Sequence, residues 1–256
     1  MAGLLLVGCS DAPAPSAPVV PSRGVVVSSP PELTTPASVT TVQPDGSGGV
    51  LRYVALGDSY TIGVGVKPRD RWPNQLARVL RPDVSLDVTA NLALNGNTTT
   101  DVIRRQLPQL EALDPQFVSL LVGVNDVIRG VSESSYRTNV GTILDAVLRS
   151  VPADRVLTVA TPDYTLTPHG GDFADPADPS PDIARQSATI ARFNDILKEE
   201  SNARGITFVD ISPVSDQVPQ DPALLTLDEL HPSGKQYAGW VELIAPVIRP
   251  LFGAYP

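Results

Sequence analysis

The alternation of strand-like and helix-like segments is the feature of this chain that most limits its fold. From Val50 onward, short apolar segments alternate with longer segments that have helical spacing. The predicted strands are Leu51–Leu56, Ser85–Thr89, Phe117–Val122, Val156–Ala160 and Thr207–Asp210. The predicted helices are Trp72–Leu80, Thr99–Leu113, Ser134–Ser150, Asp182–Arg204 and Ser233–Ile248. Nearly continuous apolar strands that alternate with helices predict an α/β fold, a doubly wound parallel sheet with helices on both faces.

Composition and charge limit the partners that such a chain can have. The 256 residues are 42% hydrophobic and 18% charged, which is typical of a globular protein that buries a sizeable core. No window reaches the apolar length that a membrane-spanning helix needs. The formal net charge is -9 and the basic residues are scattered singly, so no nucleic-acid partner is expected.

The first nine residues differ in kind from the rest of the chain. They are apolar and end in Leu6-Val7-Gly8-Cys9, which resembles the lipobox of bacterial lipoproteins, and Cys9 is the only cysteine. The resemblance implies lipidation of Cys9 and an extracytoplasmic protein, lipid-anchored at the cell envelope or otherwise secreted. No basic residue precedes the short apolar run, so segment 1–9 looks like a truncated signal segment. The alternative is a chance Gly-Cys pair.

Residues 10–49 have the composition of a linker. They are dominated by Pro, Ser, Thr, Val and Ala, and they close with Asp45-Gly46-Ser47-Gly48-Gly49. Such a composition cannot bury a core, so we expect a disordered tether between the lipid and a folded domain at 50–256. A disordered tail without this purpose is the alternative. Contact with a membrane is expected only through the anchor at Cys9.

A serine follows the first predicted strand. The strand ends in Gly57-Asp58-Ser59-Tyr60, where the glycine indicates a tight turn. Reacting groups of parallel sheets gather beyond the carboxyl ends of the strands, so Ser59 is well placed to act as a nucleophile. Alternatively, Ser59 is only the N-cap of the next helix.

Polar residues follow two further predicted strands. Gly96 lies in the polar turn 91–99, where it allows the backbone to approach a ligand closely. Asn125 follows the third strand within Gly123-Val124-Asn125-Asp126. If Asn125 faces Ser59, its amide can donate a hydrogen bond to the oxyanion of an acyl-transfer intermediate. Ordinary turns or a helix cap explain both segments equally well.

The chain has two histidines, so a serine hydrolase would use His231 or His169 as its base. Asp228 lies three residues before His231, and a turn of that length can fold its carboxylate onto the ring nitrogen that faces away from the serine. A turn at the start of a helix is the alternative. His169 lacks a carboxylate at similar spacing on its N-terminal side, so we interpret it as a surface or rim residue.

Four motifs occur in order at predicted strand ends: Gly57-Asp58-Ser59-Tyr60, Gly96 in its Asn-rich turn, Gly123-Val124-Asn125-Asp126 and Asp228-Glu229-Leu230-His231. The set resembles the four blocks of the SGNH hydrolases, also called the GDSL esterase and lipase family, and the resemblance covers nearly all of 50–252. It implies a flavodoxin-like three-layer α/β/α sandwich around a five-stranded parallel sheet.

The same resemblance implies the chemistry. Ester hydrolysis is expected to need no metal or other cofactor and to use Ser59, His231 and Asp228 as catalytic residues. The expected oxyanion hole consists of the backbone amides of Ser59 and Gly96 and the Asn125 side chain. The expected substrate is a small-molecule ester of a lipid, a lysophospholipid or an acylated sugar. Acyl transfer to a sugar or lipid alcohol and a lipid-tethered binding module without turnover are the alternatives.

The loop 161–181 fits the family less closely. Its Asp172, Asp175 and Asp178 recur every third residue, and acidic loops can bind calcium. The spacing does not match the calcium-loop pattern, and the prolines are typical of an ordinary surface segment, so no metal is expected. Tyr60, Trp72 and Arg129 flank the site loops and are candidates for an acyl pocket, although Trp72 fits a core position equally well.

Overall fold

The computed structural model describes residues 49–253 except residue 82. The predicted lipid site at Cys9, segment 1–9 and the tether, apart from Gly49, lie outside these residues. In the described part of the chain, no helix combines the length and apolar character needed to cross a membrane.

The core of the domain is the predicted five-stranded parallel sheet, and the structure gives its strand order as β2-β1-β3-β4-β5. Its strands are β1 (Leu51–Gly57), β2 (Leu86–Asn91), β3 (Phe117–Leu121), β4 (Val156–Val159) and β5 (Thr207–Val209). Because β1 pairs with β2 on one side and with β3 on the other, the chain reverses its direction across the sheet at β1. In open α/β sheets such a reversal leaves a crevice beyond the carboxyl ends of the strands. The sequence motifs that follow β1, β2 and β3 therefore meet at this crevice.

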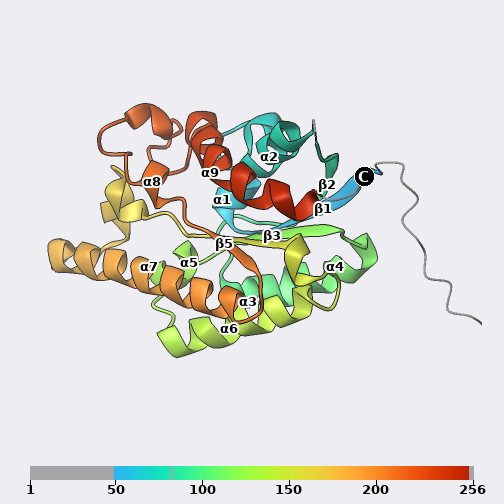
Figure 1. Cartoon of the computed structure of the whole chain (residues 1–256). Helices are drawn as coiled ribbons and strands as arrows, with labels where there is room; N and C mark the ends of the chain where they lie inside the picture. Colours follow the sequence, from blue (N-terminus) through green and yellow to red (C-terminus); the bar gives the residue numbers. More distant parts are fainter. Residues whose placement is uncertain (1–48, 82, 254–256) are drawn as a thin grey trace, which may run out of the picture. The chain divides into compact units, whose positions relative to one another are not determined.

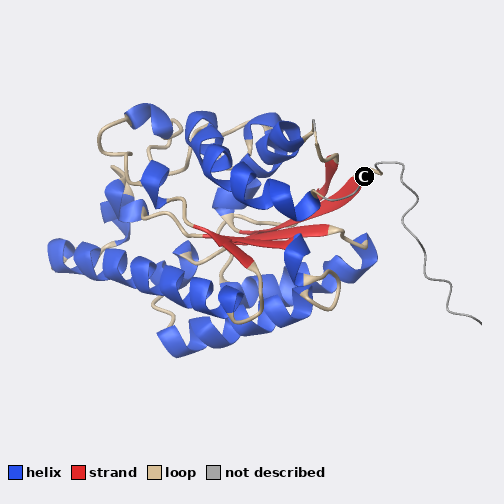
Figure 2. Cartoon of the chain, viewed as in Figure 1, coloured by secondary structure: helices blue, strands red, loops and turns tan. Residues whose placement is uncertain are grey.

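Helices cover both faces of the sheet (Figures 1 and 2). The helices are α1 (Ser59–Ile62), α2 (Trp72–Leu80), α3 (Thr99–Asp101), α4 (Leu107–Leu113), α5 (Val124–Ile128), α6 (Glu133–Val147), α7 (Pro179–Asn202), α8 (Ser212–Ser215) and α9 (Gly234–Phe252). Short 3-10 turns occupy Pro68–Asp70, Ala153–Arg155, Tyr164–Leu166, Gly170–Phe173 and Pro222–Leu224. Helices α2 and α9 lie on one face, and α4, α6 and α7 lie on the other (Figure 1). The result is the predicted three-layer α/β/α sandwich.

The predicted helix 99–113 is interrupted. A π-helical turn at Val102–Gln106 separates α3 from α4, and the backbone N–H of Leu107 donates to the carbonyl of Val102, five residues back. The next residue, Pro108, has no N–H to donate and so weakens the regular helical pattern at this point. The interruption turns the buried side chain of Gln106 toward the end of β1.

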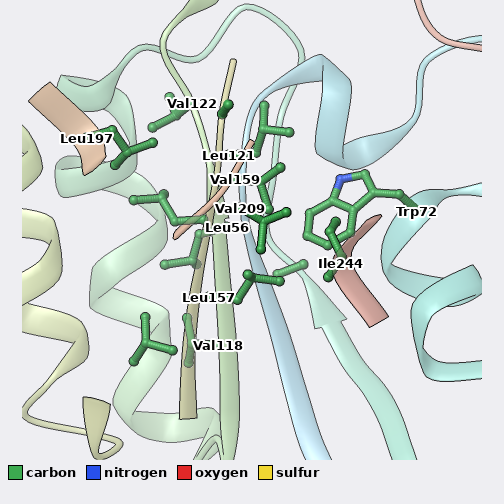
Figure 3. Packing of buried hydrophobic residues seen from close by; sticks show 14 of the residues in the cluster. Leu56, Trp72, Val118, Leu121, Val122, Leu157, Val159, Leu197, Val209 and Ile244 are labelled. Atoms are coloured by element: carbon green, nitrogen blue, oxygen red, sulfur yellow. The ribbon is translucent and has the colours of Figure 1, made fainter. Parts of the chain in front are cut away.

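The hydrophobic core lies on both faces of the sheet. Trp72 of α2 and Ile244 of α9 pack on one side of the strands, and Leu197 of α7 packs on the other (Figure 3). The apolar residues of α6 that lie three or four positions apart are buried: Val140, Ile143, Leu144 and Val147. This packing accounts for the near-continuous apolar strands, since neither face of the sheet is open to water.

Leu120 lies in β3 and is fully buried, so its truncation tests the core. We expect Leu120→Ala to lower the free energy of unfolding by about 2–5 kcal/mol, because a cavity replaces the lost contacts. Urea unfolding of 50–256 measures the change. The control is Leu227→Ala, at a fully exposed leucine, for which the expected change is within about 0.5 kcal/mol. Equal effects of the two substitutions would contradict the core described here.

Candidate active site

Ser59 lies at the crevice, directly beyond β1, as the first residue of α1. The N-cap of α1 is Asp58, whose carboxylate accepts a hydrogen bond of 3.0 Å from the backbone N–H of Tyr60. Ser59 is therefore not the cap, which was the structural alternative for this serine. Gly57 has φ of +150°, and a Cβ there would lie 2.2 Å from the carbonyl oxygen of Leu121. Only glycine allows β1 to pass this close to β3 before the chain turns into Ser59.

Two buried carboxylates connect the loops around Ser59. The Asp58 carboxylate is fully buried. Its Oδ1 accepts from the backbone N–H of Tyr60, its Oδ2 has no hydrogen-bond partner among the described residues, and it lies near the backbone of Gly123 in the loop after β3. The Asp126 carboxylate accepts hydrogen bonds from the backbone N–H (2.9 Å) and the hydroxyl (2.5 Å) of Thr99, and so joins the loops after β3 and β2. The sequence motifs contain both aspartates, but their spacing gave no sign of these roles.

Burial raises the pKa of both carboxyl groups. For Asp58, burial is the main cause; the Tyr60 N–H partly offsets it and the charge of Asp126 adds to it, giving a pKa of about 7 against an ordinary value of 3.8. The pKa of Asp126 is also raised by burial, against the hydrogen bonds from Thr99. Two acids close together in a site without water each favour the neutral form of the other.

The Asn-rich turn after β2 lies against the loop after β3. Gly96 has φ of +77°, which is in the left-handed region, and its carbonyl accepts a hydrogen bond of 2.8 Å from Arg129. The side-chain Nδ2 of Asn125 donates to the carbonyl of Asn97 at 3.0 Å. The structure thus brings the Gly96 turn and Asn125 together at the edge of the sheet where Ser59 lies. Arg129 acts here on the backbone of the turn.

His231 and Asp228 are in direct contact. Nδ1 of His231 lies 2.7 Å from Oδ2 of Asp228, while Oδ1 accepts from the backbone N–H groups of Leu230 (3.1 Å) and His231 (2.9 Å) and the hydroxyl of Thr226 (2.6 Å). Burial alone would raise the pKa of Asp228, but these hydrogen bonds outweigh it and hold the pKa well below its usual range. The carboxylate therefore stays ionised beside the ring.

The His231 ring lies beside the segment that contains Ser59. The rings of His231 and Tyr60 are 5.4 Å apart between centroids, and Tyr60 directly follows Ser59 in the chain. The hydroxyl of Tyr237 in α9 also donates to the carbonyl of Tyr60 at 2.9 Å, which fixes α9 and the segment 59–60 relative to each other. The three predicted catalytic residues thus come from loops that pack on one another.

His169 lies at the rim and contacts Glu229 in the Asp228–His231 turn. Its Nδ1 is 2.6 Å from a carboxylate oxygen of Asp172, and its Nε2 is 3.7 Å from one of Glu229. The hydrogen bond that His169 donates to the Asp172 carboxylate, with smaller contributions from the nearby charges, raises the pKa of His169. Glu229 itself has φ of +54°, which tightens the turn between Asp228 and His231. The interpretation of His169 as a rim residue agrees with this position.

Other parts of the domain do not add to the site. Trp72 is fully buried in the core, so the core interpretation holds for it. A groove of about 660 Å³ between α4 and α6 contains none of the predicted site residues. Within 49–253 without residue 82, no group of three or more His, Cys, Asp or Glu side chains is arranged to hold a metal ion.

Comparison with known proteins gives the family. The family described as "GDSL-like Lipase/Acylhydrolase family" matches residues 55–238, so this chain belongs to it and is a carboxylic ester hydrolase. An acetylxylan esterase from Geobacillus stearothermophilus is 24% identical over an alignment of 200 residues, with 75% of this chain and 80% of the esterase covered. Lipase 2 from Streptomyces coelicolor is 28% identical over an alignment of 211 residues, with 65% of this chain and 71% of the lipase covered. The predicted membership of the SGNH hydrolases is confirmed.

Solved structures share the fold. A variant of the acetyl xylan esterase from Geobacillus stearothermophilus superposes with a TM-score of 0.60 at 20% identity, covering 80% of this chain and 97% of the esterase. A member of the lipolytic G-D-S-L family from Veillonella parvula has a TM-score of 0.58 at 14% identity, covering 77% of this chain and 97% of that protein. At these identities the likeness concerns the fold, and the predicted fold class is confirmed.

The raised pKa of Asp58 predicts that the free energy of unfolding depends on pH. Between about pH 4 and 7 the unfolded chain releases this proton and the folded domain keeps it, so the wild-type protein loses stability as pH rises through this window. Asp58→Asn removes this titration and keeps a residue that can cap α1. The free energy of unfolding of the variant, relative to that of wild type, should therefore rise by on the order of 2–4 kcal/mol from pH 4 to pH 8. Urea unfolding at both pH values measures this. A stability difference between Asp58→Asn and wild type that is the same at both pH values would contradict the assignment. Asp87→Asn, at an exposed position of β2, is the control substitution.

Proposed function

We propose that this protein hydrolyses carboxylic esters through an acyl-enzyme formed on Ser59, with His231 as the base and Asp228 as its orienting carboxylate. The observation that carries the proposal is the 2.7 Å contact of Asp228 with Nδ1 of His231, in a turn whose imidazole packs beside Tyr60. This contact holds the proton on Nδ1, which leaves Nε2 free to accept one.

The proposed reaction has two halves. His231 takes the Ser59 proton as Oγ attacks the ester carbonyl, and then gives this proton to the alcohol oxygen when the carbon–oxygen bond breaks. Water then attacks the acyl carbonyl as His231 takes its proton. His231 returns this proton to Oγ of Ser59 as the bond from the acyl carbon to Oγ breaks, and the acyl group leaves as a carboxylic acid. Asp228 stabilises the imidazolium in both halves, and its lowered pKa keeps it ionised for this purpose.

The proposed oxyanion hole consists of the backbone amides of Ser59 and Gly96 and the Nδ2 of Asn125. The hydrogen bond from Asn125 to the carbonyl of Asn97 uses one of the two N–H donors on Nδ2, so the other is free for the substrate. The left-handed Gly96 and its Arg129 contact hold the turn beside Asn125. Donors fixed in this way need no rearrangement when negative charge develops.

The relatives support this assignment of roles. Solved structures of the Geobacillus esterase include catalytic mutants at a serine, at an aspartate and at a histidine three residues after the aspartate. Asp228 and His231 have the same spacing in this chain.

For the substrate, we propose esters of short acyl groups on a sugar-like alcohol. One of the relatives acts, by name, on acetylxylan, and another is a lipase. The cavity beside Tyr60, lined by Tyr164 and Leu230 among others, has a volume of about 10 Å³. This cavity is not lined by Ser59 or His231, so the short-acyl proposal rests on the acetylxylan esterase relative.

Anchoring at the cell envelope through Cys9 is a separate proposal. It rests on Leu6-Val7-Gly8-Cys9 and the tether composition of 10–49. Such an anchor would hold the hydrolase near polymers or lipids of the envelope.

Hydrolysis of nitrophenyl esters of increasing acyl length by residues 50–256 tests the function and the acyl length together. We expect the highest kcat/KM for acetyl or propionyl esters, rapid labelling by a fluorophosphonate, and loss of both in Ser59→Ala. Turnover that survives in Ser59→Ala would exclude the serine mechanism. An optimum at long acyl chains would favour lipase activity. Transfer of the acyl group to an added sugar would favour acyltransferase activity. Wild-type protein that neither hydrolyses the esters nor reacts with the fluorophosphonate would favour a binding module.

Loss of the Asn125 amide tests the oxyanion hole. We expect Asn125→Ala to lower kcat by about a hundredfold, or about 3 kcal/mol of transition-state stabilisation, with KM nearly unchanged. Steady-state kinetics on the best ester gives both constants. Asn202→Ala, at an exposed position at the end of α7, is the control and should match wild type. A decrease in kcat of less than a few fold in Asn125→Ala would remove this side chain from the role.

A further inference from the structure

Gln106 is a fully buried glutamine that ends the π-helical turn between α3 and α4. Its side-chain amide makes two hydrogen bonds to one residue at the end of β1. The Oε1 accepts from the backbone N–H of Gly57 at 2.9 Å, and the Nε2 donates to the carbonyl of Gly57 at 2.7 Å. No feature of the sequence pattern pointed to this side chain.

Gly57 needs such a partner because the neighbouring strand ends too early. The carbonyl of Ala55 accepts from the backbone N–H of Leu92, the first residue after β2. Gly57 lies two residues further along β1, so its N–H and carbonyl point to the same side of the strand as those of Ala55. The chain after β2 has turned away at this level, and the amide of Gln106 takes the place of the missing strand.

The two hydrogen bonds fix the residue from which the nucleophile segment starts. On its other side, Gly57 pairs with Leu121 of β3, and its approach to the Leu121 carbonyl leaves no room for a side chain. Gly57 is therefore held from both sides, two residues before Ser59. A buried backbone peptide without these partners would lose the full hydrogen-bonding energy of its N–H and carbonyl groups.

The π-helical turn directs the side chain of Gln106 toward Gly57. An extra residue in a helical turn shifts the residues that follow it around the axis, and such turns are frequent at functional sites. Regular helical spacing through 99–113 would turn position 106 away from its observed direction. The interruption in the predicted helix and the clamp on Gly57 thus have one structural cause.

We propose that Gln106 is a positioning residue for the nucleophile: through its two hydrogen bonds to Gly57 it fixes the position of Ser59 relative to His231 and the oxyanion donors. This inference rests on the proposed serine mechanism. Gln106 does not touch the substrate, so its loss should lower the rate of the acylation step and leave substrate binding unchanged. Small displacements of a reacting group have large effects on rate, since catalysis depends on close alignment.

The first test compares two glutamine substitutions. Gln106→Met keeps the length of the side chain and removes both hydrogen bonds. The matched control is Gln116→Met, since Oε1 of Gln116 accepts from the backbone N–H of Arg52 at the opposite end of β1, away from the crevice. We expect Gln106→Met to lower kcat and the rate of fluorophosphonate labelling by about tenfold to a hundredfold with KM unchanged, and Gln116→Met to match wild type in all three.

The second test uses pH. A neutral glutamic acid has one acceptor and one O–H donor and can repeat both contacts to Gly57, whereas a glutamate cannot donate. Burial raises the pKa of a carboxyl group at this site. The ratio of kcat for Gln106→Glu to kcat for wild type should therefore be near one at low pH and fall as pH rises. A purely structural effect of the substitution would give a constant ratio or a change that follows unfolding, which thermal melts at each pH record.

The outcomes separate this inference from the proposed function. Suppose that wild type hydrolyses the ester and is labelled. The role of Gln106 is then overturned, and the serine mechanism stands, if Gln106→Met reacts at the wild-type rate, if only its KM changes, or if the ratio of kcat for Gln106→Glu to kcat for wild type is the same at every pH. If wild type neither turns over nor labels, both are overturned. The positioning role is supported if kcat of Gln106→Met falls by more than its unfolded fraction explains and if the ratio of kcat for Gln106→Glu to kcat for wild type falls as pH rises.

Discussion

The close approach of β1 to β3 at Gly57 is the constraint on which the rest of the site depends. A Cβ at this position would lie 2.2 Å from the Leu121 carbonyl, so the strand can reach its full length beside β3 only with glycine. Directly beyond this contact the order of strands reverses, and the chain leaves the sheet into Ser59. The position of the segment that contains Ser59 is thus set by backbone packing in the sheet, before any side chain of the site is considered.

Around this point the structure uses buried polar groups as connectors between loops. Asp58 faces the backbone after β3, Asp126 binds Thr99 after β2, and Gln106 binds Gly57. Each bond is made away from water, where a satisfied hydrogen bond is strong and an unsatisfied group is costly. The loops therefore have few alternative positions, which is the preorganisation that stabilisation of an oxyanion requires. Burial of these groups disfavours their charged forms, and it therefore raises the pKa of Asp58 and of Asp126.

The two sides of the site differ in how they are held. The side formed by Ser59, Gly96 and Asn125 is fixed by buried hydrogen bonds at Gly57 and Asp126, together with the half-buried contact of Asn125 and the exposed contact of Arg129 with the turn after β2. The Asp228–His231 turn is fixed by its own short-range hydrogen bonds, by Tyr60 and by the half-exposed contact of Glu229 with His169. Exposed charge pairs contribute little to stability. The loop 161–181 therefore shapes the rim next to His231 without being needed to hold the catalytic turn together.

The sequence by itself determined the strands, the main helices, the order of the four motifs and the pairing of Asp228 with His231. Apolar runs report strands directly, and Asp228 and His231 are so close in the chain that a single turn joins them. Only the tertiary structure decided that Asp126 binds Thr99, that His169 reaches Glu229 and that the helix after Thr99 contains a π-helical turn. Gln106 and Gly57 are 49 residues apart in the chain. Whether these two residues meet depends on where β2 ends and on how α3 and α4 pack on the sheet. The periodicity of apolar residues along the chain carries no information on either of these features.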